Sequence, residues 1–244
     1  MGRPRQIVAG SASFEDSGRN LFQARLGAVI RYALDLSGAQ RPRICWLGTA
    51  RGDALSGLRA FYGATSGEDV VASHLQLFTQ PNVEPAEHLL AQDVIWVGGG
   101  SVVNLLAVWR AHGLDAIMRE AWERGVVLGG VSAGSICWHT GGTTDSFGGL
   151  RAVTDALALL PFSTCVHYDS EPGRRPLYHE LVGERALPWG YATDDGVAIH
   201  YSDGELERVI SDRAGAAAYR VTPREGGGVL EERIEPQLVG AGRR

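Results

Sequence analysis

The chain has 244 residues, of which 44% are hydrophobic and 21% charged, the composition of an ordinary globular protein. This length is enough to bury the core of one full α/β domain. A formal net charge of -5 and the lack of a basic stripe exclude the positive surface that nucleic-acid binding needs.

The three cysteines, Cys45, Cys137 and Cys165, are widely spaced and lie among apolar neighbours. This pattern is typical of reduced core thiols rather than of a disulfide framework or a metal site. The opening residues lack the apolar stretch of a signal peptide, and no uncharged run has the length of a membrane span. We therefore expect a cytoplasmic protein with no membrane partner.

Short apolar runs alternate with amphipathic stretches along the first 140 residues. Strands are predicted at residues 6–10, 43–50, 74–78, 93–100 and 126–131. Helices are predicted through residues 21–32 and at 85–90, 102–113, 114–125 and 132–138. This alternation predicts a parallel sheet with helices on both faces, whose active site lies at the carboxyl ends of the strands.

The last third of the chain has a different pattern. Two strand-like runs flank Asp203-Gly204, which is a hairpin signal. No linker or repeat divides the chain, so residues 1–221 are predicted to form a single α/β domain. Residues 222–244, rich in Gly, Glu and Arg, are expected to form a loosely packed tail.

The segment from Gly130 to Gly134 reads GVSAG and fits the pattern G-x-S-x-G between a predicted strand and a predicted helix. A nucleophile on such a sharp turn needs small neighbours, and the start of the helix directs N–H groups toward developing negative charge. Ser132 is therefore a candidate nucleophile. A plain glycine-rich turn is the structural alternative.

A nucleophilic serine needs a base and an acid that orients the base. Of the seven histidines, His167 differs from the rest because it closes the short strand-like run at 162–166, although a hydrogen-bonded core histidine is the simpler interpretation. The residues alone leave four carboxylates open as the acid: Asp145, Asp169, Asp194 and Asp195.

Residues 97–106, VGGGSVVNLL, place three glycines between a buried strand and a helix. The run lacks the last glycine of the dinucleotide fingerprint and the lysine of a P-loop, which argues against nucleotide binding. Its free N–H groups could instead form half of an oxyanion hole, with the Ala133 N–H as the other half.

These residues together resemble the peptidase E, or S51, family of serine peptidases, whose fold is similar to that of class I glutamine amidotransferases. The most specific pieces are WVGGGSVVNLL, GVSAGSICW, TTD and HYDSEP. The resemblance implies a three-layer αβα sandwich with a mostly parallel central sheet and a C-terminal β-hairpin. It also implies Ser132 as nucleophile, His167 as base, and Gly99 or Gly100 with Ala133 as the oxyanion hole.

For the acid, the dipeptidase members of the family imply Asp145, which we prefer, and the related cyanophycinases imply Asp195, which stays the rival. The dipeptidases cleave after an N-terminal aspartate and hold its carboxylate with an arginine, for which Arg174 and the adjacent Arg175 are the candidates. The expected function is an Asp-X dipeptidase that works through an acyl-enzyme, with no metal or organic cofactor.

The expected partner is a small peptide substrate, and the expected assembly is a monomer or homodimer. Two alternatives stay open: a cyanophycinase-like or other acyl hydrolase on the same fold, and a catalytically silent binding protein. Exposed Trp109 and Trp122 would favour the binding protein, whereas core packing is the simpler explanation of both.

Overall fold

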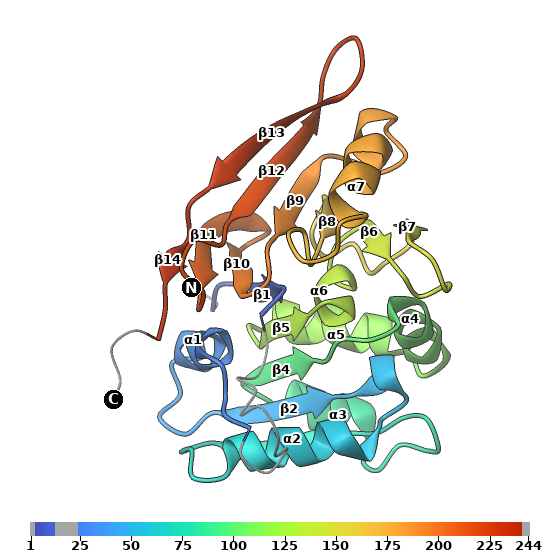
Figure 1. Cartoon of the computed structure of the whole chain (residues 1–244). Helices are drawn as coiled ribbons and strands as arrows, with labels where there is room; N and C mark the ends of the chain where they lie inside the picture. The colour runs from blue at the N-terminus through green and yellow to red at the C-terminus, as the bar shows by residue number, and fades with distance from the viewer. Residues whose placement is uncertain (1–2, 13–23, 241–244) are drawn as a thin grey trace.

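The computed structural model describes residues 3–12 and 24–240 (Figure 1). The strands are β1 (Gln6–Gly10), β2 (Arg43–Leu47), β3 (Val71–Leu75), β4 (Val94–Val97), β5 (Val127–Val131), β6 (Gly141–Thr144), β7 (Arg151–Val153), β8 (Ser163–Cys165), β9 (Gly190–Thr193), β10 (Val197–Ser202), β11 (Glu205–Ser211), β12 (Ala218–Pro223), β13 (Val229–Ile234) and β14 (Gln237–Leu238). The helices are α1 (Ala28–Leu36), the 3-10 helix η2 (Thr49–Arg51), α2 (Leu55–Thr65), α3 (Pro85–Leu90), α4 (Val102–Ala111), α5 (Leu114–Glu123), α6 (Ala133–Ile136) and α7 (Arg174–Gly183).

Within the described residues the strands form two sheets. The larger has the order β14-β11-β10-β1-β5-β4-β2-β3, and its β1, β5, β4, β2 and β3 are parallel. The smaller has the order β13-β12-β9-β8-β6-β7, with β6, β8 and β9 parallel. Helices α1 and α2 pack on one face of the large sheet and α3 to α6 on the other, which confirms the predicted αβα architecture (Figure 1).

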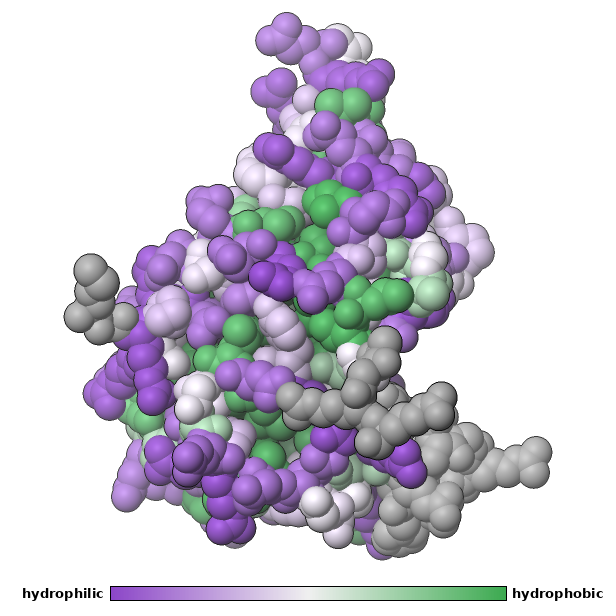
Figure 2. All heavy atoms as spheres, turned by 90° about the vertical axis from the view of Figure 1, so that its left-hand side faces the viewer, coloured by the Kyte–Doolittle hydropathy of each residue, from purple (hydrophilic) through white to green (hydrophobic). Residues whose placement is uncertain are grey.

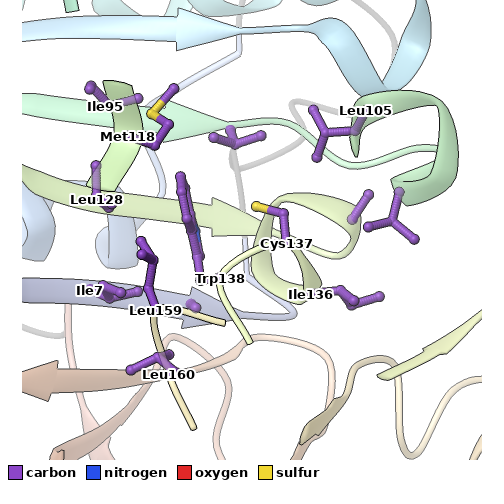
Figure 3. Packing of buried hydrophobic residues seen from close by; sticks show 14 of the residues in the cluster. Ile7, Ile95, Leu105, Met118, Leu128, Ile136, Cys137, Trp138, Leu159 and Leu160 are labelled. Carbon is purple, nitrogen blue, oxygen red and sulfur yellow. The ribbon is translucent and has the colours of Figure 1, made fainter. Parts of the chain in front are cut away.

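The core on the α4–α6 side is built around Trp138. Its side chain is fully buried and lies among Leu128 of β5, Cys137 and Leu159 (Figure 3). Trp109 and Trp122 belong to the same cluster and are 0% and 5% exposed. Core packing therefore explains both tryptophans, and they form no exposed interface.

Several predicted elements differ from the structure at their ends. The strand predicted at 74–78 is β3, which ends at Leu75, because the carboxylate of Asp53 accepts hydrogen bonds from the N–H groups of Leu77 (2.6 Å) and Phe78 (2.9 Å). The helix predicted at 132–138 is the short α6, which ends at Ile136. Of the helix predicted through residues 21–32, residues 21–23 lie outside the described ones, and α1 begins only at Ala28.

The C-terminal region is more ordered than expected. The hairpin predicted at Asp203-Gly204 is formed by β10 and β11, with positive φ at both turn residues. Most of residues 222–238, expected to form a loosely packed tail, are paired in strands, because β12 and β13 pair over six residues each and β14 pairs with β11 of the large sheet, although none of these tail residues is buried. Residues 241–244 lie outside the described part.

Figure 2 shows that the end of the molecule where β12 and β13 project is largely hydrophilic, with smaller apolar areas nearer the body. Among the described residues, no helix combines the length and the apolar character that crossing a bilayer would require.

Candidate active site

Ser132 lies between the end of β5 and the start of α6, as predicted. Its backbone angles are φ 57° and ψ -116°, a conformation that is sterically costly for a residue with a side chain. Its N–H donates to the carbonyl of Gly10 at the end of the neighbouring strand β1, at 3.0 Å. This is the strained strand-to-helix turn that exposes a serine nucleophile in hydrolases.

The two glycines of the motif are required by close backbone packing. A Cβ added to Gly130 would lie 2.3 Å from the carbonyl oxygen of Gly134, and one added to Gly134 would lie 2.2 Å from that of Val97. Both distances are far below van der Waals contact. Helix α6 therefore packs against the end of β4 only because both positions lack a side chain.

The glycine loop after β4 lies beside the serine. A Cβ added to Gly99 would lie 3.1 Å from Cβ and 3.7 Å from Oγ of Ser132, so the glycine loop after β4 touches the serine side chain. Within the described part of the chain, the amides of Gly99, Gly100 and Ala133 have no backbone acceptor, whereas the flanking Gly98 and Ser101 amides do. These three amides are available to bind an oxyanion.

His167 lies two residues after β8, and its backbone also has a positive φ, of 56°. Its N–H donates to Oγ of Ser11 at 2.9 Å. Because Gly10 holds the Ser132 backbone and Ser11 holds the His167 backbone, the end of β1 brings the two residues to the same place. No direct hydrogen bond joins their side chains within the described residues.

The imidazole of His167 is oriented by Asp195. Nδ1 of His167 and Oδ1 of Asp195 lie 2.6 Å apart, and the side chains are 23% and 36% exposed. Because a carboxylate only accepts, Nδ1 carries the proton and donates it, so in the neutral ring Nε2 is the acceptor. This is the tautomer that a general base requires.

Asp145 lies elsewhere. Its side chain is 67% exposed, and its nearest ionic contact is Nη2 of Arg174, at 3.9 Å. Strands β9 and β6 flank β8, so Asp195 and Asp145 follow the two neighbours of the strand that carries His167. The geometry brings His167 together with Asp195 and not with Asp145, contrary to the acid that we preferred.

Asp169 and Asp194, the other carboxylates considered, bond elsewhere. Asp169 accepts the N–H of Asp195, at 2.8 Å. Asp194 is 5% exposed and accepts the N–H of Ala217 at 3.0 Å, and burial raises the pKa of its carboxyl. Neither contacts the His167 imidazole.

The two arginines expected to bind a substrate carboxylate are bound to the protein itself. Arg174 is 2% exposed, and it donates to the carbonyl of Thr143 (2.6 Å) and to the carboxylate of Glu171 (2.7 Å). Arg175 forms a two-point ion pair with Glu231. Both guanidinium groups therefore have partners that a substrate would have to displace.

Comparisons with known proteins identify the family of the chain. The sequence model of Peptidase family S51 matches residues 7–209, which is most of the chain. The chain belongs to peptidase family S51. It is 44% identical over 218 residues to the uncharacterized peptidase YgaJ of Bacillus subtilis (strain 168), covering 89% of this chain and 92% of that protein.

Two solved structures share the fold of this S51 peptidase. A peptidase from an acI-B1 Actinobacterium superposes with a TM-score of 0.69 at 14% identity, covering 97% of this chain and 96% of its own. A Listeria monocytogenes EGD-e protein, assigned by name to peptidase E, has a TM-score of 0.57 at 18% identity and covers 95% and 100%. The family and fold expected from the sequence are thus confirmed.

Sequence reasoning missed one residue of the site. Ser11 holds His167 through its hydroxyl, which also lies 2.8 Å from Oγ1 of Thr193. Nothing in the sequence near Ser11 marks it, because its partners are 156 and 182 residues away. No group of three or more metal-ligating side chains occurs among the residues that the structure describes.

Proposed function

We propose that this S51 chain is a serine peptidase in which Ser132, His167 and Asp195 act together. The hydroxyl of Ser132 attacks the carbonyl carbon of a peptide bond while Nε2 of His167 takes the hydroxyl proton. His167 then gives that proton to the leaving amine, and water hydrolyses the acyl-enzyme by the same route. The amides of Gly99 or Gly100 and of Ala133 bind the oxyanion.

One observation supports this proposal above the others, the hydrogen bond from His167 Nδ1 to Asp195. It fixes the tautomer in which Nε2 is a base, and a histidine that only filled the core would need no carboxylate at 2.6 Å. The strained backbone of Ser132 supports the same conclusion, because strain of this kind is retained where a function requires it.

The substrate is proposed to be a short peptide. Cleavage after an N-terminal aspartate stays a prediction carried by the family resemblance alone. The contacts of Arg174 and Arg175 weigh against these two residues as the groups that read the carboxylate, since both are occupied by protein carboxylates.

The test combines a fluorophosphonate probe with hydrolysis of Asp-X, isoAsp-X, Glu-X and Ala-X dipeptides. Wild-type protein should take the label and cleave a peptide, and Ser132→Ala should lose both. Ser170→Ala is the matched control, because Ser170 is an exposed serine three residues past His167. No label on the folded wild-type protein would favour the silent binding protein, and label without dipeptide cleavage would favour a different acyl substrate.

A further inference from the structure

The carboxylate of Asp169 links the two loops that carry His167 and Asp195. Oδ1 of Asp169 accepts the backbone N–H of Asp195 at 2.8 Å, and its Oδ2 accepts a hydrogen bond from the guanidinium of Arg213. Because Asp169 follows His167 by two residues, this carboxylate links the loop after β8 to the loop after β9.

Arg213 is itself held in place. Its N–H donates to Oγ of Ser211 at 3.0 Å, and its Cβ packs against Gly196, where an added Cβ would lie only 2.8 Å away. Gly196 follows Asp195 directly and has a φ of +81°. Arg213 thus contacts both Asp169 and the glycine that follows Asp195.

Arg213 also faces a group of carboxylates. Asp169, Asp194 and Asp195 bring three carboxyl groups into two adjacent loops, where like charges disfavour one another. Arg213 donates to the first and is attracted to all three, which raises the pKa of its guanidinium. Burial alone would raise the pKa of Asp169, but the hydrogen bonds from Arg213 and from the Asp195 amide outweigh burial and lower it.

We propose that Asp169, held by Arg213, is the positioning residue that keeps the Asp195 carboxylate against Nδ1 of His167. The proposal rests on the proposed function, in which that contact selects the base form of His167. Asp169 has no hydrogen bond to Ser132 or to the oxyanion amides within the described residues, and its hydrogen bond to this site goes to the Asp195 amide. An ion pair that merely stabilised the fold would not affect the His167 hydrogen bond.

Asp203 provides a matched control. Its carboxylate also accepts from a backbone N–H and a guanidinium, both of Arg5, at 3.3 Å and 3.0 Å. Asp203 lies in the turn after β10, next to Ser202, which pairs with Gln6 at the start of β1. The site lies at the other end of β1, so Asp203 is far from it. Asp203→Ala also strains a residue whose φ is 52°, so it should cost at least as much stability as Asp169→Ala.

The experiment measures peptide hydrolysis and the downfield proton resonance of the His167–Asp195 hydrogen bond, assigned by its loss in His167→Gln. Asp169→Ala should lower kcat by about 10- to 100-fold with KM within about twofold, because a small displacement of a catalytic group has that effect. The downfield resonance should broaden or vanish. Asp169→Asn, which keeps an acceptor for the Asp195 amide, should recover part of both.

Asp203→Ala should change neither kcat nor the resonance. The proposal is overturned if Asp169→Ala keeps the resonance and a kcat within about twofold of wild type, or if Asp203→Ala matches its losses. Failure of the proposed function is a different result, since the wild-type protein would then cleave no peptide and take no label. The resonance tests the positioning role even in that case.

Discussion

Replacement of Asp195 by asparagine should reduce catalysis far more than the same replacement at Asp145. The Asp195 carboxylate accepts the Nδ1–H of His167 at 2.6 Å. An asparagine amide can present its NH2 group to the ring instead, which favours the tautomer with the proton on Nε2. That tautomer cannot accept the proton of the Ser132 hydroxyl.

The structure sets the expected size of this effect. The same exchange in a serine-protease triad with a buried acid lowers kcat by about 10⁴-fold. The side chain of Asp195 is 36% exposed, so water competes for the carboxylate and a smaller loss is expected. We expect Asp195→Asn to lower kcat by about 10²- to 10³-fold, which corresponds to about 3 to 4 kcal/mol of transition-state free energy.

Asp145→Asn is the comparison. Asp145 is 67% exposed and only 3.9 Å from its nearest cationic partner, so its neutralisation should change kcat by less than about threefold. The assay is the rate of fluorophosphonate labelling together with kcat and KM on the peptide that the wild-type protein cleaves best. A larger loss in Asp145→Asn than in Asp195→Asn would refute the assignment of the acid.

Three further predictions concern the scaffold of the site. Gly130→Ala should destabilise the fold by at least about 3 kcal/mol in urea unfolding, because its Cβ would meet the Gly134 carbonyl at 2.3 Å; an unchanged midpoint would contradict this packing. Burial lowers the pKa of His139 to about 4, against about 6.5 when unfolded, so the free energy of unfolding should fall by about 3 kcal/mol as pH drops from 6.5 to 4. His139→Gln should flatten this part of the pH–stability curve, whereas an equally steep curve would remove His139 as its cause. Arg174→Met should lower stability by about 3 kcal/mol without changing the ratio of Asp-X to Ala-X cleavage, and a changed ratio in a stable variant would restore Arg174 as a substrate-binding residue.

The sequence predicts the parts of the site that depend on local chemistry. The glycines around Ser132, the apolar run before them and the helix after them all lie within about ten residues, and each imposes a local steric condition. The glycine run after β4 is predicted for the same reason. The main strands of the large sheet are predicted by apolar runs. Strand β3 ends earlier than predicted because the carboxylate of Asp53, distant in the sequence, accepts hydrogen bonds from the N–H groups of Leu77 and Phe78.

The identity of the acid could not be predicted in this way. Asp145 and Asp195 each follow a strand that pairs with β8, at nearly equal height along the parallel strands. The order of elements in the sequence therefore allows either carboxylate to lie near His167. In the structure the imidazole bonds Asp195, and its placement depends on contacts between distant segments, such as the hydrogen bond from the His167 N–H to the Ser11 hydroxyl.

The end of β1 explains why the site depends on the complete fold. Gly10 bonds the backbone of Ser132 at the end of the large sheet, and Ser11 bonds both His167 and Thr193 of the small sheet. Two adjacent residues thus join the proposed nucleophile to the loops of the proposed base and acid. Each strained backbone, at Ser132 and at His167, is paired with one of these bonds. We therefore expect the geometry of the proposed site to depend on the junction between the two sheets rather than on either motif alone.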